Sequence, residues 1–130
     1  GTKGEPGEIE VLERTLKVQR KAPGVIWFDF DTLCGGNRSQ NDYLEIAREH
    51  HTLILSRVPR MSAGMASEAR RFTWLIDVLY DHRVKLVVSA ECQAYDLYRE
   101  GHKANEFLRT VSRLIEMRSR DYLAEAHRTE

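Results

Sequence analysis

Three short β-prone apolar runs, separated by segments of helical length, constrain the fold of this chain more than any other feature. They are VIWFDF at residues 25–30, HTLIL at 51–55 and VKLVV at 84–88. Strands that alternate with helices predict parallel strands joined by right-handed crossovers. We therefore expect an α/β fold, a small three-layer module with a mostly parallel sheet. HTLIL and VKLVV are continuous apolar runs of the kind buried on both faces of a sheet.

The helix between the second and third runs has the clearest pattern. Apolar side chains recur there at helical spacing, namely Phe72, Leu75, Ile76, Leu79 and Tyr80. An earlier helix is expected to begin after a capping residue, Ser39 or Asn41, and to end near residue 50. Two further helices are expected at about residues 91–99 and 104–126. The apolar stripe of the second consists of Phe107, Val111, Leu114, Ile115 and Leu123.

The amino-terminal residues have a different character. Residues 1–8 contain three glycines and one proline, which predicts a flexible lead-in. Residues 9–12 and 15–20 alternate apolar and charged side chains, which predicts a short β-hairpin. We expect residues 9–126 to form a single α/β domain and residues 127–130 a tail.

The composition is that of an ordinary globular domain. The chain has 130 residues, and its 20 basic and 20 acidic side chains cancel. This balance gives no electrostatic reason to expect nucleic acid or an anionic membrane as a partner. No apolar run approaches the ~18 residues of a membrane span. Cys34 and Cys92, without metal-ligand spacing, suit a reducing compartment, and we expect a cytoplasmic location.

The stretch HTLILSRVPRM, residues 51–61, has the pattern of the Walker B strand of a nucleotide hydrolase. Such a strand supplies a carboxylate that holds the magnesium ion and its water shell. Here Ser56 and Arg57 occupy the polar positions, and an arginine would repel a cation. The residues therefore favour an ordinary buried strand over a metal site.

A phosphate-binding loop is also missing from the sequence. No G-x-x-x-x-G-K-[ST] motif occurs, and Gly35-Gly36 is followed by Asn-Arg-Ser-Gln, without the lysine that contacts the terminal phosphates. A turn and a helix N-cap are therefore favoured over an anion site.

Two carboxylates, Asp29 and Asp31, are expected to share a strand face, where they resemble a paired-carboxylate site. No base, nucleophile or third ligand accompanies them, so surface carboxylates on a β-element are favoured. The five histidines have no ligand spacing, and we expect no metal site. These residues do not predict an enzyme in this chain alone.

Arg70 and Arg71, near the start of the long helix, have two interpretations. They are candidates for a trans-acting or sensor arginine on a phosphate. Alternatively, they flank a buried Phe72 and pair with Glu68 or Asp77.

Arg57 and Arg113 are candidates for a partner surface. Arg113 belongs to a mixed-charge series on the last helix, whose spacing is typical of a solvated, ion-paired face.

Most of the chain resembles one protein family. The segments WFDFDTLC, RSQNDY, ARRF-x-x-L-I-D-x-L-YD, VKLVVSA and SRL-x-EM-x-S-x-x-YL occur in this order between about residues 16 and 123. In combination they are similar to the carboxyl-terminal portion of the ZapE-type, or ATPase-family-gene-one-like, AAA+ ATPases. The resemblance implies half of a P-loop-like fold without the P-loop, because the Walker A, Walker B and sensor-one motifs would lie upstream.

The resemblance also implies cofactors and partners. ATP and magnesium would be bound by the upstream ATPase core of the same polypeptide, and this chain would bind no cofactor or metal. Bacterial members act in cell division at the tubulin-like ring, and mitochondrial members act in protein quality control. Arg70 and Arg71 match the double arginine of the family, whereas Arg57 stands where many members carry an acidic residue.

Two functions remain open at this point. The chain is either the domain of an ATP-hydrolysing protein that supports ATP-coupled partner binding without binding nucleotide itself, or a free-standing interaction module without enzymatic activity.

Overall fold

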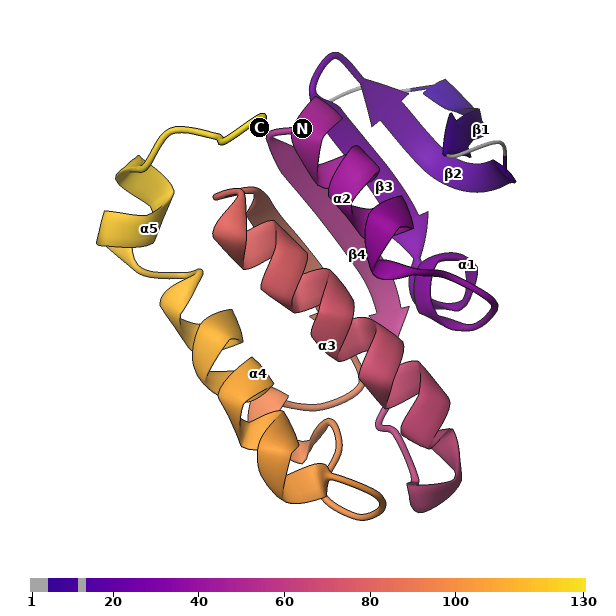
Figure 1. The fold of residues 1–130 in the computed structure, drawn as a ribbon, viewed down its shortest axis with the longest axis vertical. Coiled ribbons are helices and arrows are strands. Elements are labelled where there is room, and N and C mark those ends of the chain that lie inside the picture. Colours follow the sequence, from indigo (N-terminus) through magenta and orange to yellow (C-terminus); the bar gives the residue numbers. More distant parts are fainter. Residues whose placement is uncertain (1–4, 12–13) are drawn as a thin grey trace.

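The computed structural model describes residues 5–11 and 14–130 and contains a five-stranded sheet in the order β1-β2-β3-β4-β5. The strands are β1 (Glu5–Val11), β2 (Arg14–Ala22), β3 (Val25–Asp29), β4 (Thr52–Val58) and β5 (Lys85–Ala90). Strands β1, β2 and β3 are antiparallel neighbours, whereas β3, β4 and β5 run parallel. The predicted α/β class, with a hairpin followed by a parallel part, is confirmed (Figure 1).

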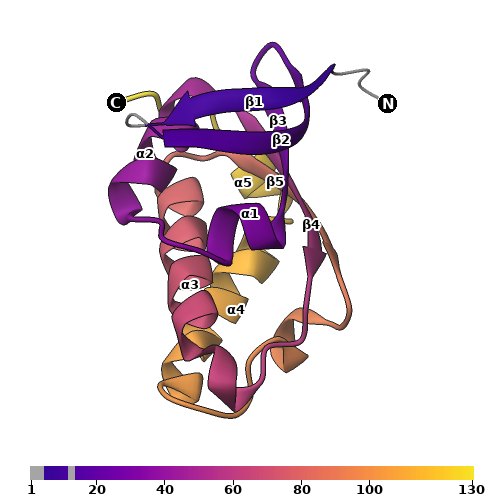
Figure 2. The same cartoon turned by 90° about the vertical axis from the view of Figure 1, so that its right-hand side faces the viewer.

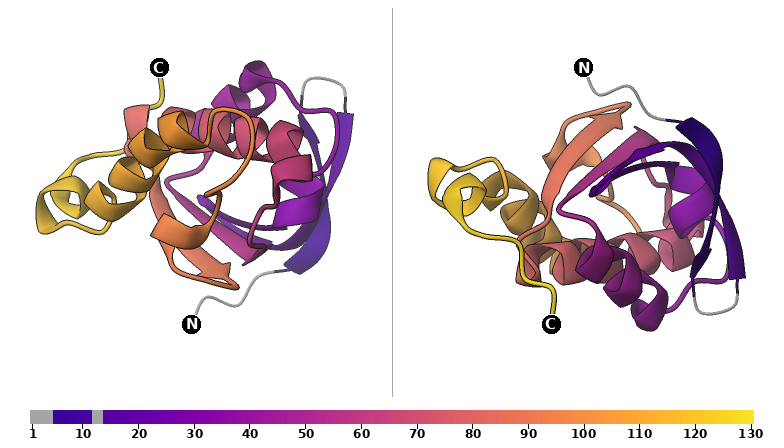
Figure 3. Two further views of the ribbon diagram at one scale, coloured as in Figure 1. Left: turned by 90° about the horizontal axis from the view of Figure 1, so that it is seen from below. Right: turned by 90° about the horizontal axis from the view of Figure 1, so that it is seen from above.

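The principal helices are α1 (Phe30–Cys34), α2 (Gln40–Glu49), α3 (Ala66–Asp81), α4 (Ala104–Glu116) and α5 (Arg120–Ala124). Two short 3-10 turns, η1 (Ala63–Met65) and η2 (Ala94–Asp96), precede α3 and α4. Helices α1, α2, α3 and α4 lie on the same side of the sheet (Figures 1 and 2). The two end-on views show α2 and α3 side by side against the strands (Figure 3).

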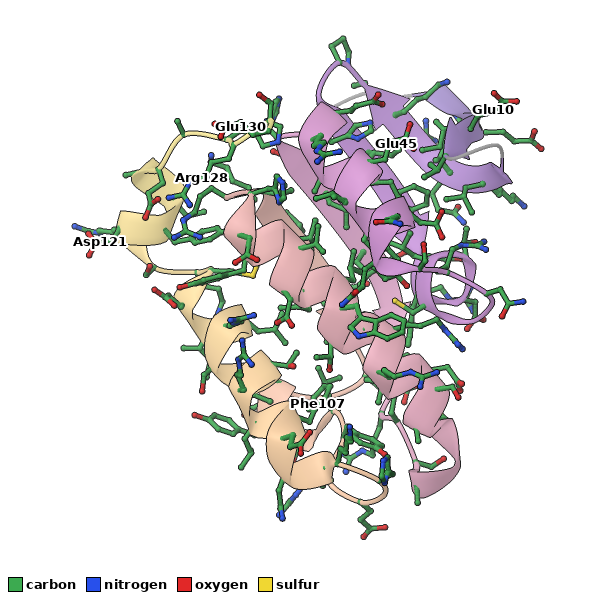
Figure 4. All side chains as sticks on the ribbon, viewed as in Figure 1. Glu10, Glu45, Phe107, Asp121, Arg128 and Glu130 are labelled. Atoms are coloured by element: carbon green, nitrogen blue, oxygen red, sulfur yellow. The ribbon has the colours of Figure 1, made fainter. Side chains whose placement is uncertain are left out.

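The core lies between these helices and one face of the sheet. Because side chains alternate along a strand, Ile26 and Phe28 of β3 face the helices and are fully buried. Trp27, between them, faces the opposite side and is partly exposed. The ring of Phe72 on α3 lies 6.1 Å from that of Phe30 on α1 and 6.0 Å from that of Phe107, which projects from α4 (Figure 4). Four residues of the predicted apolar stripe of α3 are buried, Phe72, Leu75, Ile76 and Leu79, whereas Tyr80 is partly exposed.

Of the two capping candidates, Ser39 and Asn41, Ser39 is the residue that caps α2. Its hydroxyl accepts a hydrogen bond from the Asp42 backbone N–H, and the Asp42 carboxylate accepts one from the Ser39 backbone N–H at 2.7 Å. This reciprocal arrangement is a capping box, which satisfies two donors at the start of the helix.

The hairpin begins earlier than expected. Strand β1 starts at Glu5, inside the stretch expected to be a lead-in, and residues 1–4 lie outside the described residues. The predicted turn falls partly at residues 12–13, which also lie outside them.

Two strand predictions were wrong at their ends. Residue 30 was expected in a strand, but Phe30 begins α1, so Asp31 lies on a helix and does not share a strand face with Asp29. Strand β4 continues three residues past Leu55 to Val58, because the Glu91 backbone N–H donates to the Val58 carbonyl and the Arg57 backbone N–H donates to the Ser89 hydroxyl of β5. These contacts lie between strands distant in sequence, which the local pattern does not report.

Residues 84–88 were predicted to form a buried strand; the strand was confirmed, but its burial was wrong. The strand exists as β5, but it lies at the edge of the sheet, with Val87 56% exposed and Val88 36% exposed. Apolar composition predicts a strand but does not say how many neighbours it has.

Both helices expected after β5 differ from the prediction. Residues 91–99 contain only η2, because the Met61 backbone N–H donates to the Leu97 carbonyl and ties this segment to the loop after β4. The expected helix at 104–126 is two helices, and Ser119 caps the second through the Tyr122 backbone N–H. Because of this break, Tyr122 is buried in place of the predicted Leu123, which is 43% exposed.

Candidate functional site

The carboxyl ends of the parallel strands are where α/β sheets usually bind ligands. Here Asp29 ends β3 and pairs in register with Ser56 of β4. One Asp29 carboxylate oxygen accepts a hydrogen bond from the Ser56 hydroxyl at 2.6 Å, and the other accepts from the Gln19 amide at 3.1 Å. The Trp27 indole N–H donates to the same hydroxyl at 2.8 Å. The Asp29 carboxylate is therefore engaged by neighbouring side chains within the sheet.

Arg57 follows Ser56 at the exit of β4. Its backbone is left-handed (φ 63°) at an irregularity in the β4–β5 register, and its N–H donates to the Ser89 hydroxyl at 3.1 Å. The Arg57 side chain is exposed. Among the described residues, no group of three or more His, Cys, Asp and Glu side chains is placed to hold a metal ion.

The glycine pair leads into the α2 capping box. The Asp42 carboxylate is 1% exposed and occupies the helix N-terminus, where a phosphate would otherwise accept backbone N–H bonds. Gly35 and Gly36 thus belong to a turn before a self-capped helix, as predicted, and these residues do not fit a nucleotide phosphate.

The two adjacent arginines of α3 have different surroundings. The Arg71 guanidinium donates through Nε to the Cys34 carbonyl at 2.7 Å, and its Nη2 lies 3.5 Å from the Glu68 carboxylate. Its side chain is only 13% exposed. Arg71 therefore connects α3 to the end of α1, and it pairs with one of the two acids expected from the sequence.

Arg70 is exposed and faces the other way. Its guanidinium carbon lies 5.2 Å from the centre of the Trp74 ring, one turn further along α3. Both residues line a groove of about 510 Å³ between α3 and the start of α4, which we call the α3–α4 groove. Lys103 and Glu106 lie on its α4 side. Trp74 was not among the predicted site residues, although its i,i+4 spacing from Arg70 places the two on one helix face.

Arg113 does not lie on an open surface. Its guanidinium pairs with the Asp77 carboxylate and lies 5.1 Å from the centre of the Tyr80 ring, with 19% of the side chain exposed. The Tyr80 hydroxyl donates to Glu116 at 2.6 Å, and this bond raises the Tyr80 pKa. Asp77 also lines the α3–α4 groove. Because Arg113 is paired with Asp77, its guanidinium lies near the groove that Arg70 lines. The role of Arg113 is to hold α4 against α3.

The cysteines differ sharply in accessibility. Cys34 is fully buried, and burial raises the pKa of its thiol to about 12, which makes it a poor nucleophile. Cys92 is partly exposed after the end of β5.

This chain matches the family model described as AFG1-like ATPase over residues 1–126. The chain belongs to the AFG1-like ATPase family. Cell division protein ZapE of Escherichia coli K12 is 43% identical over 119 residues, which are 92% of this chain and 32% of ZapE. Lactation elevated protein 1 homolog B of Danio rerio is 30% identical over 157 aligned residues, which are 96% of this chain and 31% of that protein.

The chain spans about a third of the length of these curated relatives. No solved structure matches this AFG1-like chain significantly. Among its described residues, none of the helices has the length and apolar character needed to cross a membrane.

Proposed function

We propose that these residues form the carboxyl-terminal domain of a cytoplasmic, ATP-hydrolysing AAA+-like protein of cell division or protein quality control. The observation that carries the proposal is the family match over residues 1–126. ATP and magnesium are bound by an ATPase core that precedes these residues in the same polypeptide. The domain supports ATP-coupled binding of a protein partner and binds no nucleotide by itself.

The chemistry of the strand ends supports assigning the nucleotide site to another part of the polypeptide. The Asp29 carboxylate already accepts hydrogen bonds on both oxygens, and Asp42 fills the α2 N-terminus. A cation, Arg57, stands where a magnesium ligand would be needed. The relatives are about three times as long as this chain, which leaves room for a separate core.

Arg70 is the side chain we propose to act on a phosphate of a neighbouring subunit or core. It is exposed at the rim of the α3–α4 groove, whereas Arg71 is held by Cys34 and Glu68. A guanidinium can neutralise charge that develops during phosphoryl transfer without any rearrangement of this domain.

For a bacterial parent, the proposed partner is the tubulin-like division protein. The support is the description of the 43% identical relative as a cell division protein. We place the partner surface near the exposed Arg57, because Arg113 is engaged with Asp77.

Calorimetry tests whether nucleotide is bound outside these 130 residues. The 130-residue chain titrated with Mg-ATP should give no binding heat, and the longer natural polypeptide that contains it should bind and hydrolyse ATP. Micromolar affinity in the short chain would overturn the proposal. A reading frame that starts just before Glu8, without an upstream P-loop, would favour the free-standing interaction module instead.

A further inference from the structure

Strand β5 has one open edge. In the part of the chain that the structure describes, it is the last strand of the sheet and pairs with β4 alone. The Lys85 backbone N–H donates to the His51 carbonyl, next to β4. Because successive N–H groups of a strand point to opposite sides, those of Leu86 and Val88 point away from β4. Figure 3 shows β5, in salmon, at the end of the sheet opposite the indigo hairpin.

The other edge of the sheet is protected against further pairing. Strand β1 contains Pro6, which has no N–H to donate, and exposed Glu8 and Glu10. Its register also shifts between Glu5 and Gly7. Proline, charges and register irregularities are the usual means by which a sheet edge avoids a new strand.

Strand β5 has no proline and no charge after its first residue, and the irregularity in its pairing with β4 comes from an extra residue in β4, near Arg57. The β5 sequence, KLVVSA, carries no charge or proline beyond Lys85, and Val87 and Val88 are 56% and 36% exposed. A continuous apolar run is typical of a parallel strand that is buried on both faces, as the interior strands of a sheet are. Strand β5 therefore has the sequence of an interior strand at an edge position.

An apolar groove runs beside this edge on the helix side of the sheet. Its volume is about 350 Å³, and we call it the β5 groove. Its apolar lining includes Leu86, Val88, Cys92, Leu97, Leu114 and Met117. Side chains of an added strand would therefore find apolar contacts in the groove on one face and Val87 on the other.

We infer that the β5 edge pairs with an apolar β-strand from the part of the longer polypeptide that lies outside these 130 residues. This inference rests on the proposed function, which supplies that longer polypeptide. The relatives have the necessary length, since the chain spans only 32% of ZapE. The added strand continues the sheet, covers Val87 and Val88, and seats alternate side chains in the β5 groove. The domain is thereby joined to the ATPase core through a shared sheet.

Residue-resolved hydrogen exchange tests this pairing. In the 130-residue chain, the outward N–H groups of Leu86 and Val88 should exchange much faster than that of Val87, which points toward β4. In the longer polypeptide, both should slow by at least about a hundredfold, because exchange then requires the sheet to open. Alkylation of Cys92 should slow in parallel. Unchanged exchange of Leu86 and Val88 in the longer polypeptide would overturn the inference.

A proline substitution provides a second test. Val88→Pro removes an outward N–H and leaves the β4 hydrogen bonds in place, so the domain should fold while the added strand loses its partner. In the longer polypeptide, Val88→Pro should restore fast exchange at Leu86, whereas the matched control Val88→Ala should not. Protection of Leu86 and Val88 in the short chain that grows with concentration would instead identify a second copy as the occupant and overturn the inference.

The outcomes separate this inference from the proposed function. Mg-ATP binding by the longer polypeptide with unprotected β5 amides would contradict the shared sheet alone. Protected β5 amides in a longer polypeptide that fails to bind Mg-ATP would contradict the ATPase function alone.

Discussion

The Nε of Arg71 donates a hydrogen bond to the backbone carbonyl of Cys34 at 2.7 Å, although the two residues lie 37 positions apart. The contact joins the second turn of α3 to the carboxyl end of α1, and the arginine is largely buried around it. Arg71 therefore has a structural role, because it connects α1 to α3, whereas its neighbour Arg70 does not make this contact.

Replacing these arginines singly should affect stability unequally. Arg71→Ala leaves a buried carbonyl without its charged donor and should lower the free energy of unfolding by about 1–3 kcal/mol. Arg70→Ala, at an exposed position, is the matched control and should leave the urea midpoint nearly unchanged. Equal midpoints for the two variants would contradict the assigned contact.

In the proposed longer polypeptide, replacing Arg70 should change ATP turnover without changing stability. If Arg70 acts on a phosphate, Arg70→Ala should reduce ATP turnover by at least about tenfold while the melting temperature stays constant. Arg109→Ala, an exposed arginine on α4, controls for the loss of one positive charge. A normal turnover rate in Arg70→Ala would remove this candidate.

Only one of the two thiols should react in the native chain. Cys34 is buried with a pKa raised to about 12, whereas Cys92 is partly exposed. At about pH 8, a thiol reagent should modify one cysteine per folded chain and two after unfolding. Cys92→Ser should abolish the native reaction. Rapid modification of two thiols in the folded wild type would contradict the packing of α1.

The carboxyl-terminal segment should contribute a pH-dependent stability. The hydrogen bond from Arg83 to Glu125, at 2.8 Å, lowers the pKa of that carboxyl below its ordinary value. The unfolded chain therefore binds this proton more readily, so the contribution is present above the ordinary glutamate pKa and is lost as pH falls through the lowered value.

Urea titrations between about pH 3 and 7 measure this effect. Glu125→Gln should be less stable than wild type near neutral pH and should show a shallower loss of stability on acidification. The exposed Glu100→Gln is a control for the loss of one negative charge. A parallel pH profile for Glu125→Gln and wild type would contradict the prediction.

Several elements follow directly from local sequence. The apolar period of α3 predicts the helix and most of its buried face, and one of the two predicted capping residues, Ser39, begins α2, because these signals depend on residues three or four positions apart. The three strand cores are likewise predicted by their apolar runs. The family motifs identify the ATPase family to which the chain belongs.

The candidate site was predicted less completely. The sequence identifies Arg70 and Arg71 as a pair but cannot assign one to Cys34 and the other to the groove with Trp74. It also predicts an ion-paired face for Arg113, whereas Asp77, on a different helix, is the actual partner. The two residues of the Arg113–Asp77 pair lie on different helices, so the pair forms only because α4 packs against α3.

Local sequence specifies the strand–helix alternation, the cap of α2 and the absence of a phosphate-binding lysine motif, because each depends on neighbouring residues or residue types. Contacts between distant segments are what place β5 at an edge and bind Asp29 to Ser56 and Gln19. The physical reason is that a strand's apolar run specifies burial against some neighbour, whereas the number and identity of its neighbours are set by contacts between segments far apart in the chain.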